Sequence, residues 1–283
     1  DIIDGLVSSF RRSEKLQIHT RFLYSVGSIY RRHNGNLLYH GCIPCDGNGE
    51  FMEFSLYSDT PLKGRAFLDW ADRLARQGYF APDGSMERLR GLDFLWFLWC
   101  GRNSPICGRT KITTFERALI EDKASYTEPK NPYYVYYGSE EFCRRILDDF
   151  DLHKPWSRII NGHMPVKVKE GEDPRKGGGR LVVIDGGFCK AYHKQTGIAG
   201  YTMFFSSHGM RIAAHEPFTT REEAIHGKKD ITSHSFIVEN LPRRLMISDT
   251  DAGEGIKRRI EDLNALLDAY RSGTIKTDST GRI

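Results

Sequence analysis

The sequence predicts a mixed α/β fold, in which helices and isolated strands precede a strand-rich region. Residues 1–32 carry apolar side chains at helical spacing. Two short apolar runs, 36–39 and 158–161, lie between helical stretches and end next to a His-Gly and a Gly-His pair. From residue 164 onward the pattern changes to short strands separated by turns. This order of elements is typical of α/β proteins rather than of all-helical or all-β proteins.

The helices after the first strand are predicted from apolar periodicity and from end signals. Helices at 64–78 and 86–100 follow the first long loop, and the second is so apolar that we expect Trp96 and Trp99 to be buried. Ser139 begins another helix, since serine is a favoured N-cap. The last helix is expected to stop at Gly273. Its apolar positions are Ile256, Ile260, Leu263, Leu266 and Leu267.

The strands are predicted from short apolar runs bounded by turn residues. Asn34-Gly35 begins the first strand, and the turn at 206–209 joins the two arms of a hairpin. The expected strands are 36–39, 158–161, 181–184, 201–205, 210–214, 235–238 and 244–247.

Length and composition exclude several classes of protein. A chain of 283 residues with 39% hydrophobic and 12% aromatic residues can form one large or two small folded domains and is not wholly disordered. Its net charge is 41 − 37 = +4, too low for a dedicated nucleic-acid binder but compatible with an anionic substrate. The longest apolar run, 94–100, is too short for a membrane span. Six cysteines are typical of a reduced protein, so we expect a cytoplasmic location.

The first residues indicate a longer protein. The chain starts at Asp1 rather than at a methionine, inside a predicted helix, and residues 1–12 show no signal-peptide pattern. We therefore expect residues 1–35 to be a helical lead-in from a preceding half, and 251–283 to be a terminal helix and tail.

His40 and His163 are the candidate metal ligands. Each lies at the end of a predicted strand beside a glycine, where open α/β sheets place their ligands. Neutral imidazole binds borderline divalent metals, although a single histidine in such a turn is more often structural. A binuclear phosphoesterase site also needs carboxylates. We expect the usual carboxylate runs, D-x-H and G-D-x-x-D, to be absent from this chain, so these residues alone do not complete such a site.

Three further features have both a functional and a structural interpretation. Arg102, Arg109 and Lys111 could bind phosphate, or they could be solvated loop charges. Cys42-x-x-Cys45 could bind zinc or act in redox chemistry, but a lone pair of this kind is a weak signal. The glycine-rich loop 167–180 could be a flap over an anionic substrate, but it lacks the ending of a phosphate-binding P-loop.

Longer motifs point to a family. H-G-x-I-P at 40–44, G-H-x-P at 162–165 and I-D-G-G at 184–187 resemble the later half of calcineurin-like metallophosphoesterases. The runs WFLWCGRNSPICGRTKITTFERALIEDK, KNPYY, EFCRRILDDF and LVVIDGGFCKAYHKQTGIAGYTMFFSSHGM are similar to bacterial class III fructose-1,6-bisphosphatases. This resemblance covers nearly the whole chain.

The resemblance implies a fold and an activity. Members hydrolyse the 1-phosphate of fructose 1,6-bisphosphate in gluconeogenesis, favour Mn²⁺ in a binuclear site, and fold as a two-sheet sandwich flanked by helices. Residues 36–250 would be the C-terminal part of that domain, with a helical insertion at about 64–150. His40 and His163 would bind one metal, and Pro165 stands where many relatives have a second histidine. The 6-phosphate would contact Arg102, Arg109 or Lys111.

The other ligands and a general-acid histidine are expected in the missing N-terminal half, since we also expect no G-N-H-[DE] run here. The catalytic residues of this chain are therefore unknown, and the chain alone is expected to be inactive. Alternatives are a dinucleoside-tetraphosphate hydrolase, a serine/threonine protein phosphatase, or a non-catalytic assembly module. The expected partners are a phosphorylated sugar and the N-terminal half, not nucleic acid or membrane, and assembly into a homo-oligomer stays open.

Overall fold

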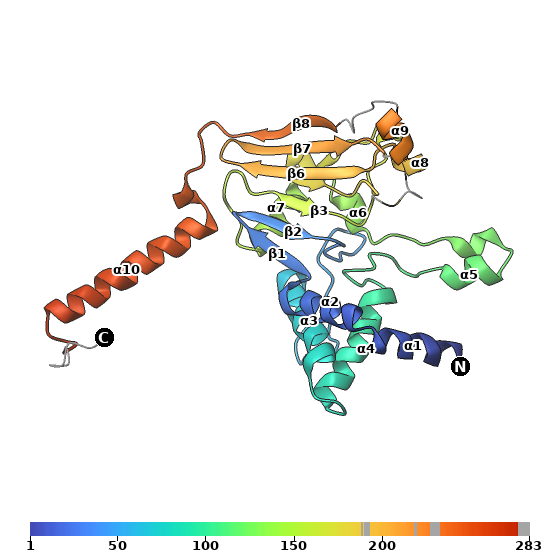
Figure 1. Ribbon diagram of the computed structural model, residues 1–283, viewed down its shortest axis with the longest axis horizontal. Coiled ribbons are helices and arrows are strands. Elements are labelled where there is room, and N and C mark those ends of the chain that lie inside the picture. The colour runs from blue at the N-terminus through green and yellow to red at the C-terminus, as the bar shows by residue number, and fades with distance from the viewer. Residues whose placement is uncertain (188, 190–192, 218–219, 227–232, 277–283) are drawn as a thin grey trace.

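The computed structural model describes residues 1–187, 189, 193–217, 220–226 and 233–276. It shows two sheets flanked by helices, with a long C-terminal helix projecting from the body (Figure 1). The α-helices are α1 (Ile2–Arg12), α2 (Glu14–Val26), α3 (Gly64–Phe80), α4 (Met86–Cys100), α5 (Thr114–Leu119), α6 (Tyr133–Tyr136), α7 (Glu140–Asp149), α8 (His193–Thr196), α9 (Arg221–His226) and α10 (Asp251–Arg271). The strands are β1 (Tyr30–His33), β2 (Asn36–Tyr39), β3 (Ile159–Asn161), β4 (Arg175–Lys176), β5 (Leu181–Val183), β6 (Gly200–Ser206), β7 (Gly209–His215) and β8 (Ser233–Asn240). Short 3-10 turns are η1 (Lys123–Tyr126), η2 (Val168–Glu170), η3 (Gly177–Gly179) and η4 (Ile247–Asp249).

The larger sheet is mixed, with the strand order β1-β2-β3-β5-β4. Its three central strands β2, β3 and β5 run parallel, with Leu37 opposite Ile159 and Ile159 opposite Leu181. These three side chains are fully buried in one core cluster that also holds the apolar side chains of α7. The antiparallel sheet β6-β7-β8 contributes Tyr201, Met210 and other inward side chains to the same cluster. The prediction of a mixed α/β fold is thus confirmed.

The first 32 residues differ from the expected helical stretch. Ser13 ends α1 and caps α2, accepting a hydrogen bond from the backbone N–H of Leu16. Gly27 then ends α2, and residues 30–33 form the edge strand β1, paired antiparallel with β2. Strand β1 is mostly exposed, so it lacks the apolar run on which the other strand predictions relied.

The expected strand at 244–247 is wrong. Arg243 binds the carboxylate of Asp249 at 2.9 Å, and the same carboxylate accepts a hydrogen bond from the backbone N–H of Met246. These contacts close a turn that leads into η4 and α10. This local ion pair and hydrogen bond therefore stabilise a turn where the apolar run predicted a strand.

Helix α4 packs on α3 through glycines rather than through its tryptophans. A Cβ atom on Gly91 would lie 2.2 Å from the backbone nitrogen of Gly78, so the two helices cross in close contact. Phe94 and Leu98 of α4 are buried, whereas Trp96 is 65% and Trp99 60% exposed. The expectation that these tryptophans are buried is wrong, because the glycines select which face of α4 meets α3.

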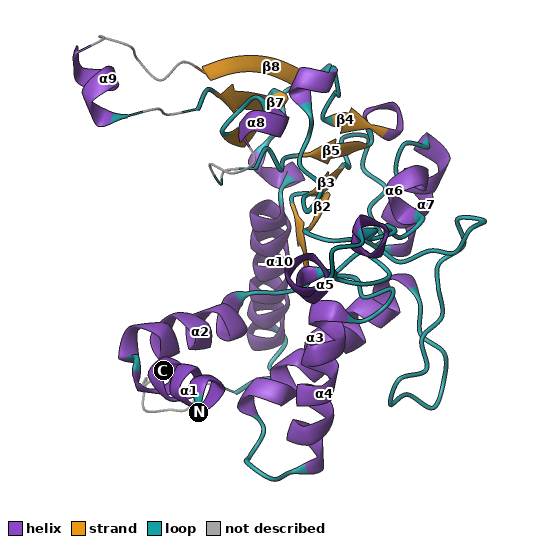
Figure 2. Cartoon of the chain, turned by 90° about the vertical axis from the view of Figure 1, so that its right-hand side faces the viewer, coloured by secondary structure: helices purple, strands orange, loops and turns teal. Residues whose placement is uncertain are grey.

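Helix α10 is attached at its N-terminal end. The backbone N–H of Asn34 donates to the Asp251 carboxylate at 2.7 Å, and the backbone N–H of Asp251 donates to the Asn34 side chain. Lys154 adds an ion pair with Glu254 at 2.9 Å. From there the helix leaves the sheets (Figures 1 and 2). In the described part of the chain, no helix is long and apolar enough to cross a membrane.

Candidate functional site

Two parallel strands bring His40 and His163 to the same sheet edge. Tyr39 is opposite Asn161 in the β2–β3 pair, so the residues that follow both strands emerge side by side. His163 Nδ1 lies 3.4 Å from His40 Nε2. The two rings are nearly perpendicular, with centroids 5.2 Å apart. Each imidazole therefore turns a nitrogen toward the other.

Glycines beside each histidine allow this approach. A Cβ atom on Gly41 would lie 1.9 Å from the carbonyl oxygen of Pro105, and one on Gly162 would lie 2.8 Å from His40 Nδ1. His163 itself has a φ of 67°, a left-handed conformation that non-glycine residues rarely adopt. Such strain persists where the surroundings impose it and is concentrated at functional sites.

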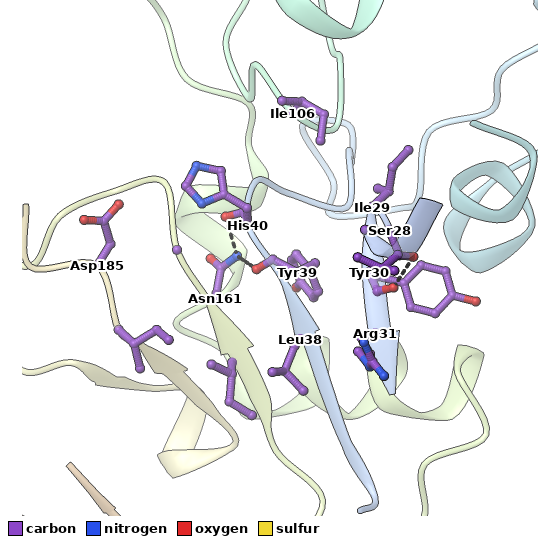
Figure 3. A pocket seen from close by; sticks show the side chains of 15 residues that line it. Ser28, Ile29, Tyr30, Arg31, Leu38, Tyr39, His40, Ile106, Asn161 and Asp185 are labelled. Atoms are coloured by element: carbon purple, nitrogen blue, oxygen red, sulfur yellow. Dashed lines mark hydrogen bonds between the residues drawn. The ribbon is translucent and has the colours of Figure 1, made fainter. Parts of the chain in front are cut away.

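Asn161 fixes the backbone that carries His40. Its side-chain amide donates to the carbonyl oxygens of Tyr39, His40 and Gly41 at 3.2, 3.1 and 2.8 Å. Figure 3 shows the first two of these bonds. Its own oxygen accepts from the Tyr133 hydroxyl at 3.3 Å. Asn161 is only 1% exposed, so these bonds have no competition from bulk water. Sequence reasoning missed Asn161, although it is the polar last residue of an otherwise apolar strand and directly precedes Gly162.

The environment of His163 favours its neutral form. Burial lowers the pKa of His163, and the charges of His40 and Arg109 lower it further. The Tyr134 ring stacks beside it, with centroids 6.2 Å apart. Nε2 of His163 is buried and has no hydrogen-bond partner among the described residues. Neutral imidazole is the form that binds metals.

The pair of histidines fits a divalent metal ion in part. Two nitrogen ligands that each lie about 2.1 Å from one ion are separated by roughly 3–3.4 Å, which matches the spacing seen here. Within the described ranges, however, no group of three or more His, Cys, Asp or Glu side chains could hold a metal. The chain thus offers two ligands of a site, not a complete one.

A third strand end brings a carboxylate to this edge. Strand β5 lies next to β3, and Asp185 follows it directly after Ile184. Asp185, His40 and Gly162 line one end of an open cavity of about 630 Å³ (Figure 3). The rest of that cavity is largely apolar and extends over Leu38 and Ile160 of the sheet face. Sequence reasoning missed Asp185, although it ends a strand just as the two histidines do.

The three candidate phosphate-binding residues have different surroundings. Arg109 is half-buried, forms an ion pair with Glu128, and acts electrostatically on His163. Lys111 is exposed and donates to the carbonyl oxygen of Ser125 at 2.9 Å. Arg102 is exposed, and nothing in the described structure links it to the histidines. The structure therefore brings only Arg109 into the surroundings of the histidine pair.

The cysteine pair and the glycine-rich loop have structural roles here. Cys42 and Cys45 are free and buried, and burial raises the pKa of the Cys45 thiol to about 12. Such thiols stay protonated and are poor ligands and nucleophiles. In the loop, Gly177 packs so closely on α7 that a Cβ would lie 2.5 Å from Cys143 Sγ.

The sequence does contain one D-x-H run, so the expectation that this motif is absent is wrong. Asp151-Leu152-His153 is a D-x-H run. It follows α7 rather than a strand, its aspartate is bound to Arg65, and His153 pairs with Asp148 at 3.1 Å. The run therefore supplies no ligand beside His40 and His163.

Comparison with known proteins identifies the family. The sequence profile of the "Firmicute fructose-1,6-bisphosphatase" family matches residues 1–272. A "Fructose-1,6-bisphosphatase class 3" of Clostridium botulinum (strain 657 / Type Ba4) is 50% identical over all 283 residues, which cover 42% of that relative. One of Clostridium novyi (strain NT) is 47% identical over 276 residues, 98% of this chain and 41% of the relative. No solved structure matches. The chain thus spans about 42% of the length of such relatives, and it belongs to the Firmicute fructose-1,6-bisphosphatase family.

Proposed function

We propose that the full-length protein hydrolyses the 1-phosphate of fructose 1,6-bisphosphate to give fructose 6-phosphate, in gluconeogenesis in the cytoplasm. We further propose that His40 and His163 hold one ion of a binuclear Mn²⁺ site. The observation that carries this proposal is the convergence of two imidazole nitrogens at 3.4 Å at a sheet edge, in a chain of this family. The two-sheet metallophosphoesterase sandwich is the corresponding fold, of which residues 36–250 would form the later part.

The residues of this chain have distinct tasks in that reaction. A divalent ion bound here supplies Lewis-acid chemistry, which neutralises phosphoryl charge and lowers the pKa of water. His40 and His163 present their nitrogens as ligands, and burial lowers the pKa of His163 and so favours its neutral, metal-binding form. Asn161 holds the His40 backbone in place through three carbonyl oxygens. Arg109 keeps positive charge beside the site, where it favours the neutral form of His163 and an incoming anion.

The remaining ligands belong to the rest of the protein in this proposal. The matched relatives are more than twice as long as this chain, because it covers 42% of their length. We propose that a preceding half supplies the carboxylates of the second ion and the general acid. His40 and Asp185 line an open cavity of about 630 Å³, and we propose that the preceding half covers it. This chain by itself is then inactive.

The test is phosphate release from fructose 1,6-bisphosphate with Mn²⁺, for the full-length protein and for the 283-residue chain side by side. Turnover by the full-length protein alone is the expected result. Turnover of a dinucleoside polyphosphate or a phosphopeptide instead would keep the metal site and reject the substrate. Absence of hydrolysis with all three substrates would favour the non-catalytic assembly module.

A further inference from the structure

Two cations face each other at the closest spacing that a β-bridge allows. Arg109 and Lys130 are partners in an isolated antiparallel bridge. The flanking hydrogen bonds run from the Asn131 N–H to the Gly108 carbonyl and from the Thr110 N–H to the Pro129 carbonyl. In this pattern the enclosed pair is the non-hydrogen-bonded type, with Cα atoms about 4.5 Å apart and side chains on one side. Like charges directly opposite one another destabilise a bridge.

Only one of the two charges is compensated. Arg109 donates to Glu128, whose carboxylate also accepts two bonds from Thr113. Among the described residues, no carboxylate lies within ion-pair distance of Lys130. Glu172 is the acid whose charge acts on Lys130, but it is bound by Lys176 at 2.7 Å and by the Lys167 backbone.

The surroundings increase the excess of positive charge. Lys130 is an exposed residue, and partial desolvation together with the charges of Arg109 and Lys167 lowers its pKa. An anion placed between Arg109 and Lys130 would remove this repulsion. The ammonium of Lys130 has three donors and is exposed, and within the described ranges it forms no side-chain hydrogen bond or ion pair, so it can bind such an anion.

The bridge is packed against the histidine pair. Asn131, next to Lys130, is buried, and its side-chain oxygen accepts from the backbone N–H groups of Cys45 and Tyr133. On the other strand, Gly108 leaves room for the Tyr134 hydroxyl, which would lie 2.6 Å from a Cβ there. The Tyr134 ring in turn stacks on His163.

Two buried polar atoms lie on the side of the bridge that faces the histidine pair. The Tyr134 hydroxyl and His163 Nε2 are both buried, and neither has a hydrogen-bond partner among the described residues.

We propose that Lys130, opposite Arg109, binds the phosphate of the substrate that is not hydrolysed, while Glu128 holds Arg109 in position. This subsite rests on the proposed function, in which the metal ions hold the reacting phosphate and a separate cation is needed for the other one. Lysine suits this task because it acts as a point charge toward phosphate. The ligand class is a phosphorylated sugar, and free phosphate shares its chemistry.

The kinetic test uses Lys130→Met in the full-length protein, with Lys123→Met as the control, since Lys123 is an exposed lysine of η1 away from the bridge. We expect Lys130→Met to raise KM for fructose 1,6-bisphosphate at least 10-fold with kcat within about 3-fold, because one charge-assisted hydrogen bond is lost. Turnover of p-nitrophenyl phosphate, which has a single phosphate, should not change. Lys130→Arg should restore most of the KM effect. A Lys130→Met variant that matches Lys123→Met would overturn the subsite.

A binding test separates this proposal from the proposed function. Inorganic phosphate is titrated calorimetrically into the EDTA-treated full-length protein, so that neither turnover nor metal enters the result. At least 10-fold weaker binding by Lys130→Met than by Lys123→Met supports the subsite even if fructose 1,6-bisphosphate is not the substrate. Equal binding by both variants, or undetectable binding by the wild type, overturns it. Thermal unfolding checks the fold, and removing one of two facing cations should not lower Tm.

Discussion

Similar apolar side chains are buried in the central sheet but exposed to solvent on helix α10. Leu37 in β2 is 0% exposed, whereas Leu263 in α10 is 63% exposed. The apolar side chains of α10 recur at spacings of three and four residues, as in a packed helix, yet they face solvent here. Helices α1 and α2 likewise expose most of their apolar side chains. The periodicity of apolar residues therefore predicts that α10 is a helix, but not what packs against its apolar face. The apolar side chains of the sheet, in contrast, pack within the described core.

The largest expected difference is between a histidine at the edge of the central sheet and one on an exposed helix. His40→Ala in the full-length protein should lower phosphate release by a factor on the order of 1,000 or more, because a metal ligand is lost. The matched variant His19→Ala, on the exposed face of α2, should leave activity within about 2-fold. Steady-state kinetics with unchanged circular dichroism measures both. An active His40→Ala variant would contradict the ligand assignment.

Leucine truncation tests the comparison through stability. Leu37→Ala should cost about 2–5 kcal/mol of unfolding free energy, since it leaves a cavity in the core. Leu263→Ala should cost less than about 0.5 kcal/mol if α10 is solvated as described. Urea unfolding of this chain gives both values. Equal losses would mean that the exposed face of α10 is covered in solution.

Asparagine variants compare a buried with a solvated amide. Asn161→Ala should cost about 1–3 kcal/mol, because three carbonyl oxygens lose their donor. Asn264→Ala on α10 should be neutral or slightly stabilising, since alanine is the better helix former. The free energies come from the same urea unfolding experiment. A neutral Asn161→Ala would show that water replaces the lost donor.

The smallest effect is a pH dependence at the Arg109 bridge. Burial raises the pKa of Glu128, but hydrogen bonds from Thr113 and the charges of Arg109 and Arg117 outweigh it, so that the pKa lies below the usual 4.5. A lowered pKa contributes stability above about pH 4.5, which is lost as the pH falls through the folded-state value. Glu128→Gln should therefore flatten the acid side of the stability curve. Unfolding curves at pH 3–6 that run parallel for both proteins would contradict this.

The sequence predicts helices and strands well where the local pattern of apolar residues is enough to determine the structure. The apolar runs of β2, β3 and β5 and the hairpin of β6 and β7 are found where they were expected. Strand β1 could not be predicted, because it is polar and is a strand only by pairing with β2. The exposure of Trp96 and Trp99 depends on a glycine contact between two helices, which no single stretch of sequence shows.

The candidate site divides in the same way. Because His40 and His163 each follow a strand and lie beside a glycine, the sequence predicted them as metal ligands. The parallel pairing of β2 with β3 then places His163 Nδ1 3.4 Å from His40 Nε2. Asn161 and Asp185 were missed because their roles come from neighbouring strands. The pairing of Lys130 with Arg109 joins residues 21 positions apart through an isolated bridge, so only the fold reveals it.

The most direct test of the account is the affinity of the full-length protein for Mn²⁺. Titration followed by electron paramagnetic resonance compares the wild type, His163→Ala and the control His19→Ala. We expect His163→Ala to weaken Mn²⁺ binding at one site by at least about 10–100-fold, with the affinity of the control unchanged. Identical Mn²⁺ affinity in all three proteins would contradict the claim that this sheet edge is a metal site.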